Sequence, residues 1–361
     1  MERARVLVHG ATGYTGKLVC AELARQKTPF AVSGRNREKL EAVAREHGAA
    51  EVVVLDIRDR AAVEAAVRDR AIVCACAGPF AQVGEPIVGA CARLGVGYVD
   101  TTGEQRFVVD MAERWGAEAE KTGAFLVPGM AYEIAPADWA AHVAAERVKG
   151  APETIDILYA NKVDGGYGAA TSRGTKLSAL GMLGERDTYQ FVAGKLVREP
   201  PAEIVRYFAL SSGKRITGVS FPSLEAVVVP KHTGARTVRT FMAVGEAAGR
   251  ALHGARKVTP FFAKGISKIG ARFVGTSREG PPPDERARSV FEIVAVASID
   301  DKKGVARLKG RDMYGLTGKL QAYAAARALA GAVHAKGLVG PSVAFPPDEA
   351  LDAFAAELEL S

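Results

Sequence analysis

Glycines at positions 10, 13 and 16 stand between an apolar run and a helical pattern, in the stretch GATGYTG. A glycine-rich turn between a strand and a helix can place backbone N–H groups and the helix N-terminus against a pyrophosphate. In this interpretation, Gly10 and Gly13 form the tight turn and Gly16 lets the helix pack on the sheet. An ordinary strand-to-helix turn is the alternative. The predicted phosphate cradle consists of Gly10, Ala11, Thr12, Gly13, Tyr14, Thr15 and Gly16.

The residues after the second expected strand indicate which dinucleotide would bind. A site for NAD generally carries an Asp or Glu there, whereas a 2′-phosphate needs cationic partners. The chain has SGRNREK at this point, with no acid before Glu38, and Arg35 can stack on adenine and bind a phosphate bidentately. NADP(H) is therefore predicted, although a solvated basic helix start would look the same. The residues assigned to this end are Ser33, Gly34, Arg35, Asn36 and Lys39, with Asp56 expected near the adenine amino group.

Two further loops follow expected strands and are predicted to reach the nicotinamide half of the cofactor. The fourth strand ends in CAGPF, which would place backbone beside the ribose and Phe80 against the pocket. After the fifth strand, Glu104 either lies beside the nicotinamide ribose or only compensates a helix dipole. The predicted contacts are Ala77, Gly78, Pro79, Phe80, Gly103 and Glu104.

The elements that position these residues alternate regularly at the start of the chain. Residues 1–140 read as strand, helix, strand, which predicts a Rossmann-type, doubly wound parallel sheet in an α/β fold. Residues 141–313 are predicted to form a second α+β domain with a mixed or antiparallel sheet. Its expected strands are Thr154–Lys162, Glu225–Pro230 and Ser289–Ile299. Residues 314–361 are expected to be a C-terminal helical region that returns to the first domain or covers the sheet.

The composition of the chain argues against several classes of function. The 361 residues carry a net charge of 48 − 41 = +7, so an anionic partner is plausible, while the lack of an aromatic stacking platform argues against nucleic acid. The four cysteines form no C-x-x-C pair and have no neighbouring His cluster, so no metal site is expected. Neither a signal-peptide core nor an apolar run of about 18 residues is present, which predicts a cytoplasmic protein.

Five motifs in order carry a resemblance to a known family. GATGYTG, SGRNREKL, CAGPF, CARLGVGYVDTTGE and VPGMAYEIAPADW resemble the saccharopine dehydrogenase-like oxidoreductases. GYGAATSRGTKLSAL and the C-terminal YGLTGKLQAYAAARAL with KGLVGPSVAFPP look most like the trans-acting enoyl reductase branch. The resemblance covers residues 1–180 and 310–350. It implies an NADP-binding Rossmann domain, an interrupted second domain, and hydride transfer in a cleft between them.

Candidates for catalysis are fewer. No Tyr-x-x-x-Lys pair is present, which argues against the mechanism of short-chain dehydrogenases. Tyr132 follows the sixth expected strand, where a parallel sheet presents its carboxyl-end loops, and could donate a proton. Lys176, near a helix start, could hold a carboxylate or thioester oxygen. Buried packing of Tyr132 and simple capping near Lys176 are the structural alternatives, and His9 is expected to be a packed residue.

One basic segment suggests a partner. Residues 255–275 interleave lysines and an arginine with phenylalanines and isoleucines, a pattern typical of docking to an anionic membrane or an acidic carrier protein. A solvated flap is the alternative. A peripheral association with a membrane is therefore added to the cytoplasmic prediction, and oligomerisation stays open.

The resemblance and the residues together predict an NADPH-dependent oxidoreductase. The expected substrate is an activated C=C (enoyl) bond of a lipid-like or polyketide-type molecule. The alternatives are a saccharopine-type C=N reductase acting on an amino-acid-derived substrate, and a non-catalytic NADP(H)-sensing protein.

Overall fold

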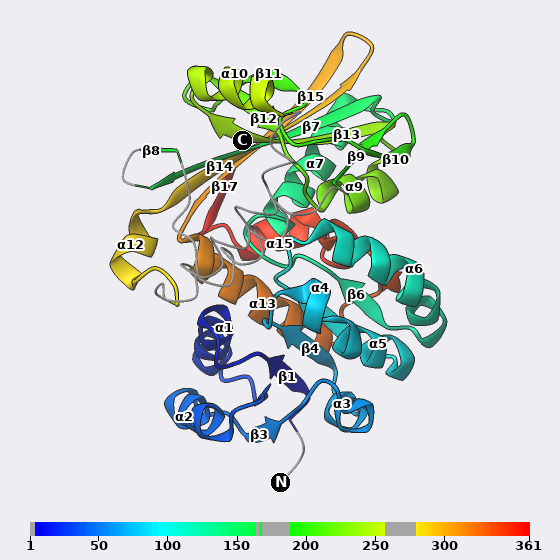
Figure 1. The fold of residues 1–361 in the computed structure, drawn as a ribbon, viewed down its shortest axis with the longest axis vertical. Coiled ribbons are helices and arrows are strands. Elements are labelled where there is room, and N and C mark those ends of the chain that lie inside the picture. Colours follow the sequence, from blue (N-terminus) through cyan, green and yellow to red (C-terminus); the bar gives the residue numbers. More distant parts are fainter. Residues whose placement is uncertain (1–3, 164–165, 168–187, 257–278) are drawn as a thin grey trace. The chain divides into compact units, whose positions relative to one another are not determined.

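The chain forms two compact units in a computed structural model that describes residues 4–163, 166–167, 188–256 and 279–361 (Figure 1). The first unit takes residues 1–102, 107–132 and 314–345, and the second takes 103–106, 133–313 and 346–361. The sequence predicted a single C-terminal region from 314 to 361, whereas residues 346–361 group with the second unit. Each unit is therefore built from separate stretches of the chain.

The first unit is organised around a seven-stranded sheet whose strand pairs are all parallel. Its spatial order is β16-β6-β5-β4-β1-β2-β3, so the strand order reverses at β1, as in Rossmann-type folds. This confirms the predicted doubly wound sheet and adds one short strand from the C-terminal region. The strands are β1 (Val6–His9), β2 (Phe30–Gly34), β3 (Glu51–Val54), β4 (Ile72–Ala75), β5 (Gly97–Asp100), β6 (Phe125–Val127) and β16 (Gly337–Leu338).

Helices of the first unit follow the expected amphipathic pattern and have clear end signals. The Asn36 side chain caps α2 by accepting a hydrogen bond from the Lys39 N–H at 2.9 Å. The same helix ends at Gly48, whose φ of 70° is the left-handed conformation that glycine tolerates. The helices are α1 (Tyr14–Arg25), α2 (Arg37–His47), α3 (Arg60–Val67), α4 (Phe80–Val83), α5 (Glu85–Leu94), α6 (Gln105–Thr122), α13 (Met313–Leu329) and α14 (Pro341–Ala344).

The C-terminal helix α13 packs on α1, which confirms its predicted return to the first domain. At Gly318 a Cβ atom would lie 3.1 Å from the Leu18 carbonyl oxygen, so the two helices approach closely. The rings of Tyr14 and Tyr314 meet edge to face, with centroids 5.1 Å apart. Helix α13 is therefore part of the first unit's core although it is remote in sequence.

The second unit contains a mixed sheet. Its main path is β10-β9-β13-β7-β14-β15-β17, with β12 also paired to β13, β11 to β12, and β8 to β7. The pair β13–β7 is parallel and the others are antiparallel, which confirms the predicted mixed sheet. The strands are β7 (Thr154–Val163), β8 (Gly166–Tyr167), β9 (Tyr189–Val192), β10 (Lys195–Arg198), β11 (Val205–Ala209), β12 (Arg215–Ser220), β13 (Thr237–Val244), β14 (Val290–Ile299), β15 (Lys302–Arg311) and β17 (Leu358–Leu360).

Helices of the second unit include one that the sequence predicted wrongly. Residues Glu225–Thr233 form α9, not the strand expected at Glu225–Pro230. The residues Glu225 to Val229 are all buried, so no helical period is visible, and a short apolar run alone cannot distinguish a strand from a buried helix. The helices are α7 (Ala135–Val148), α9 (Glu225–Thr233), α10 (Glu246–Ala255), α12 (Pro283–Arg288) and α15 (Pro347–Ala353).

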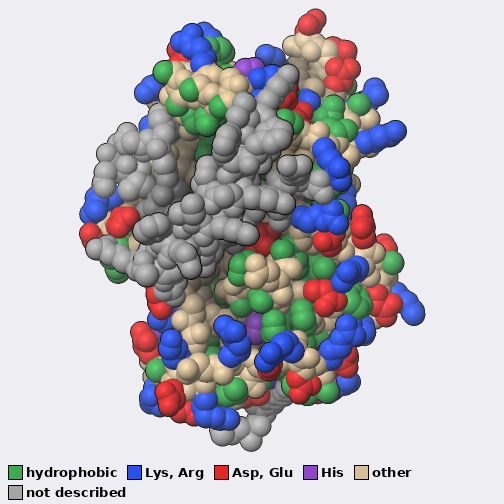
Figure 2. Space-filling model, viewed as in Figure 1, with side chains coloured by type: hydrophobic (Ala, Val, Ile, Leu, Met, Phe, Trp, Pro, Cys, Tyr) green, Lys and Arg blue, Asp and Glu red, His purple; other side chains and the backbone are tan. Residues whose placement is uncertain are grey.

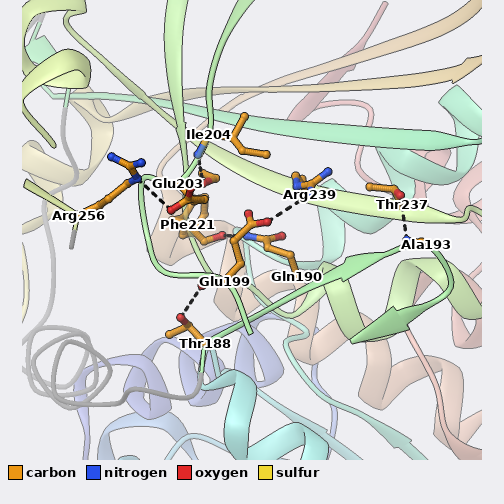
Figure 3. A network of polar contacts seen from close by, with 11 residues as sticks. Thr188, Gln190, Ala193, Glu199, Glu203, Ile204, Phe221, Thr237, Arg239 and Arg256 are labelled. Atoms are coloured by element: carbon orange, nitrogen blue, oxygen red, sulfur yellow. Dashed lines mark hydrogen bonds and ion pairs between the residues drawn. The ribbon is translucent and has the colours of Figure 1, made fainter. Parts of the chain in front are cut away.

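Side-chain contacts fasten the connection after β10 to the sheet (Figure 3). The Arg239 guanidinium on β13 lies 3.2 Å from a Glu199 carboxylate oxygen. Gln190 on β9 donates to the Phe221 carbonyl at 2.8 Å, and Arg256 binds Glu203 at 2.9 Å. Glu199 and Glu203 thus tie the segment between β10 and β11 to β13 and to the end of α10.

A helix must be long and apolar to cross a lipid bilayer. In the part of the chain that the structure describes, no helix is both long and apolar enough to cross a membrane. On the face drawn in Figure 2, acidic and basic side chains are interspersed over the first unit.

Candidate functional site

The turn between β1 and α1 is built of backbone. Gly10 has a φ of +79°, its N–H donates to the Ser33 carbonyl at 2.9 Å, and the Gly13 N–H donates back to the Gly10 carbonyl at 3.0 Å. Gly13 is the N-cap of α1, where no side chain caps the helix and the first turn carries no acid. The N-terminus of α1 therefore offers backbone donors and its positive dipole end to an anion.

Two glycines of this turn stand where a larger residue would not fit. A Cβ at Gly10 would lie 2.8 Å from the Ala77 backbone nitrogen, and one at Gly16 would lie 2.3 Å from the Gly10 carbonyl oxygen. Gly13 is exposed and meets only the Gly10 oxygen, at 3.3 Å. The structure thus brings the predicted cradle beside the loop after β4 and leaves the Gly13 edge open.

His9, the last residue of β1, is a packed residue, as the sequence predicted. Its Nδ1 lies 3.0 Å from the Ser33 hydroxyl at the end of β2. Burial lowers the pKa of His9 to about 4, so the imidazole is neutral at physiological pH. The residue therefore couples the ends of β1 and β2 and adds no charge to the cradle.

The end of β2 presents cations to solvent. Arg35 is exposed, and so are Arg37, Lys39 and the nearest acid, Glu38, in the first turn of α2. Asn36 faces the helix as its cap and Ser33 is buried against His9. Among the residues predicted here, Arg35 and Lys39 therefore have the exposure that a phosphate ligand needs.

Asp56 lies beyond β3 and has a partner that the sequence analysis missed. Arg58 Nη2 and Nε approach its carboxylate at 2.6 Å and 3.0 Å, and the Arg58 N–H donates at 3.0 Å. These hydrogen bonds from Arg58, with weaker electrostatic help from Arg35, lower the pKa of Asp56 to about 2. Asp56 thus remains charged and bound to Arg58, and it places a further guanidinium at this edge of the sheet.

Phe80 is mostly a core residue. It is 5% exposed and its ring centroid lies 5.8 Å from that of Phe107. Ala77 contacts the position of Gly10, as described above, whereas Gly78 and Pro79 lead into α4. Within CAGPF the structure therefore places Ala77, rather than Phe80, against the glycine turn.

The loop after β6 carries Tyr132, and side chains hold its backbone. The buried carboxylate of Asp100 accepts a hydrogen bond from the Gly129 N–H at 2.7 Å and from the Thr102 N–H at 3.0 Å. It also accepts from the Tyr98 hydroxyl at 2.8 Å. Asp100 therefore ties the loops after β5 and β6 together at the carboxyl edge of the sheet.

Helix α13 holds the same loops from the C-terminal region. The Gln321 amide donates to the carbonyls of Asp100 and Met130, both at 2.9 Å. The Thr317 hydroxyl accepts from the Tyr132 N–H at 3.2 Å. The sequence analysis did not predict roles for Asp100, Thr317 and Gln321. Only Asp100 has a recognisable signal, because it is an acid at the carboxyl end of a parallel strand.

Glu133 directly follows Tyr132 and is the first residue of a stretch that belongs to the second unit. Two buried side chains, Tyr159 and Glu225, lie at its carbonyl group. The Tyr159 hydroxyl hydrogen-bonds to the Glu133 carbonyl and to Glu225. Burial, with the nearby Asp138 and Glu133 charges, raises the pKa of Glu225 well above its usual range. Burial therefore favours the protonated form of Glu225, which lies with Tyr159 against the Glu133 carbonyl. The sequence analysis missed this pair because it predicted residues Glu225–Pro230 as a strand.

The remaining predicted residues are Gly103, Glu104, Lys176 and the segment 255–275. Gly103 and the buried Glu104 group with the second unit, and α6 begins directly after them. A Cβ at Gly103 would lie 3.6 Å from a Glu133 carboxylate oxygen. Lys176 and most of the segment 255–275 lie outside the described residues, so their predicted roles stay predictions.

Comparisons with known proteins agree with the architecture. A family model described as NAD(P)H-binding matches residues 10–150. A saccharopine dehydrogenase-like oxidoreductase of Bos taurus is 26% identical over 251 residues, which are 63% of this chain and 58% of the relative. A Mycobacterium tuberculosis protein named as a trans-acting enoyl reductase is 30% identical over 186 residues, or 49% of this chain and 44% of that protein. The chain thus spans about half the length of these curated relatives.

A solved structure extends the likeness over the whole chain. Saccharopine dehydrogenase (L-Glu forming) of Saccharomyces cerevisiae superposes with a TM-score of 0.63, covers 99% of both chains and is 14% identical. At this identity the likeness concerns the fold. The family resemblance drawn from the five motifs is confirmed, and the cofactor class is a nicotinamide dinucleotide.

Proposed function

From this chain's relationship to the saccharopine dehydrogenase-like oxidoreductases, we propose that it is an NADPH-dependent reductase of an activated carbon–carbon double bond. NADPH, when bound, supplies the hydride. The chain's own residues hold the dinucleotide, orient the loops at the carboxyl edge of the sheet, and provide a proton.

The observation that carries the proposal is the pairing of an open glycine cradle with an exposed arginine. The N-terminus of α1, at the end of the turn that the three glycines shape, would bind the pyrophosphate, and Arg35 would bind the 2′-phosphate bidentately. Lys39 adds positive charge at the same edge, whereas the charge of Arg58 is offset by Asp56. An acid that would prefer the 2′-hydroxyl of NAD is missing at the end of β2, where Gly34 and Arg35 stand.

Tyr132 is the proposed proton donor. Hydride addition to the β-carbon of an enoyl thioester leaves an enolate, which takes up one proton at the α-carbon. The Tyr132 hydroxyl would give that proton and recover it from solvent. The hydrogen bonds to Gly129, Met130 and the Tyr132 N–H support this role, because they fix the backbone from which the side chain projects. Lys176 is proposed to hold the thioester oxygen.

The name of the M. tuberculosis relative supports an enoyl substrate, while the names of the mammalian relatives suit the alternative of a C=N substrate. Activity distinguishes the two. NADPH oxidation should be followed at 340 nm with the crotonyl thioester of N-acetylcysteamine, and separately with a 2-oxo acid plus a primary amine. Turnover of the thioester alone is expected. Turnover of the imine-forming mixture alone would overturn the enoyl assignment.

Variants test the proposed proton donor. We expect Tyr132→Phe to lower kcat by about 10²–10⁴-fold, the usual contribution of a general acid, with NADPH affinity unchanged. Tyr207→Phe is the matched control because Tyr207 is an exposed tyrosine of the second unit. Equal activity of Tyr132→Phe and wild type would remove Tyr132 from the mechanism.

A further inference from the structure

A polar seam runs between two packed helices of the second unit, α7 and α9, which lie side by side (Figure 1). Asp138, His142 and Glu146 recur at four-residue intervals and so share one face of α7. His232 on α9 meets this face. The proposed reduction does not use this seam, whose residues all belong to the second unit.

The two imidazoles face each other through the same ring atom. His142 Nδ1 and His232 Nδ1 are 3.3 Å apart. Each far nitrogen lies near a carboxylate: His232 Nε2 is 2.7 Å from Asp138 Oδ1, and His142 Nε2 is 3.4 Å from Glu146 Oε1. The order along the seam is therefore carboxylate, imidazole, imidazole, carboxylate.

These carboxylates favour a particular tautomer. A carboxylate only accepts hydrogen bonds, so Asp138 draws the His232 proton to Nε2, and the charge of Glu146 near His142 Nε2 favours the same tautomer of His142. Both Nδ1 atoms then turn their lone pairs toward each other across 3.3 Å, and two facing lone pairs repel unless a cation lies between them. A shared proton or a metal ion would satisfy this arrangement.

We propose that His142 and His232 form a two-nitrogen site for a divalent late transition metal such as Zn²⁺. Two Zn–N bonds of about 2.05 Å at a tetrahedral angle place the nitrogens about 3.3 Å apart, which is the separation observed. A carboxylate on the non-ligating nitrogen is the usual outer partner of metal-bound histidine. Histidine nitrogen is a preferred ligand of Zn²⁺, Ni²⁺ and Cu²⁺.

The surroundings suit an exchangeable ion. Among the described residues no group of three or more His, Cys, Asp or Glu side chains is arranged to hold a metal, so solvent must complete the coordination here. The His142 side chain is 29% exposed, which gives that solvent access, whereas that of His232 is 7% exposed. Asp138 and Glu146 offset the charge of a divalent ion. The sequence predicted no metal site because the cysteines form no C-x-x-C pair and have no neighbouring His cluster. His142 and His232 are 90 residues apart, so their pairing is not visible in the sequence.

The site can be tested on the full-length protein without any enzymatic substrate. Zn²⁺ titration by calorimetry at pH 7.5 is expected to give one ion per chain, and a thermal unfolding midpoint raised by about 5 °C at a hundredfold excess over Kd. Cu²⁺ bound at the same site is expected to show coupling to two nitrogen nuclei by electron paramagnetic resonance. Both signals should disappear in His142→Gln and in His232→Gln.

Two further variants keep this test decisive. His142→Gln alters a partly exposed side chain, so its fold should survive even if His232→Gln is unstable. His334→Gln removes an exposed imidazole of the first unit and should leave Zn²⁺ binding unchanged. Failure of wild-type protein to bind Zn²⁺, or equal binding by His142→Gln, would overturn the proposal and leave a shared-proton hydrogen bond between the rings.

Discussion

At the residue scale, the ends of β1 and β2 show how neighbouring side chains divide structural and binding roles. His9 is buried against Ser33 and stays neutral, whereas Arg35, two residues beyond Ser33, is exposed and charged. Asp56 and Arg58 neutralise each other at the end of β3. His9 therefore contributes to the stability of the fold, whereas Arg35 is available to bind a ligand.

Replacing His9 by Asn should weaken the acid sensitivity of the fold. The pKa of His9 is lowered from 6.5 to about 4 in the folded state. Below pH 6.5 the unfolded chain therefore binds a proton that the folded chain excludes, so stability falls as the pH drops from 6.5 to 4. The loss reaches about 3 kcal/mol at about 1.4 kcal/mol per unit. Urea unfolding at pH 7 and pH 5 measures it.

Asn can keep a polar atom near the Ser33 hydroxyl without titrating in this range. We expect the pH 7 to pH 5 difference in unfolding free energy to shrink in His9→Asn, and to remain in His334→Asn, which alters an exposed imidazole. An unchanged difference in His9→Asn would contradict the assigned pKa.

At the element scale, helix α13 holds two loops at the carboxyl edge of the parallel sheet. Thr317 and Gln321 lie four residues apart on α13, so they share one face and reach the loops after β5 and β6 together. Asp100 ties the same loops from β5. The position of Tyr132 thus depends on a helix nearly 200 residues away in the chain.

Thr317→Val tests this role of α13 with little change of shape. The variant removes the acceptor of the partly buried Tyr132 N–H; a fully buried unpaired donor costs about 1–3 kcal/mol, so the cost here is expected at the lower end. Hydrogen exchange of the loop amides 129–133 should speed up, and kcat should fall while NADPH affinity holds. Thr317→Ser retains the hydroxyl and should behave as wild type. Wild-type exchange in Thr317→Val would show that the bond does not order the loop.

At the scale of the whole molecule, the sequence predicted the features that depend on local patterns and missed those that depend on contacts between remote residues. The alternation of strands and helices in residues 1–140 predicted the parallel sheet and its glycine turn correctly. Strand β16 has two residues, Gly337 and Leu338, too few to show a period, and its pairing to β6 joins residues about 200 apart. The contacts of Asp100 with Gly129, and of α13 with both loops, are equally non-local.

Truncation tests whether the C-terminal region is part of the first unit. A chain ending at residue 312 lacks α13 and β16 and exposes the apolar surface that Leu320, Ala324 and Ala325 cover. We expect it to lose near-UV circular dichroism and to bind anilinonaphthalene sulfonate. A chain ending at residue 357, which lacks only β17 and Ser361, should still unfold cooperatively. Cooperative unfolding of the shorter chain would contradict the assignment.

We propose that the first unit binds NADPH and that Arg35 holds its 2′-phosphate. The most direct test compares the dissociation constants of NADPH and NADH, from nucleotide fluorescence, in wild type, Arg35→Ala and the exposed control Arg45→Ala. We expect wild type to prefer NADPH, Arg35→Ala to bind NADPH about 10- to 100-fold more weakly with NADH unchanged, and Arg45→Ala to match wild type. Tighter binding of NADH than of NADPH by the wild-type protein would contradict the account.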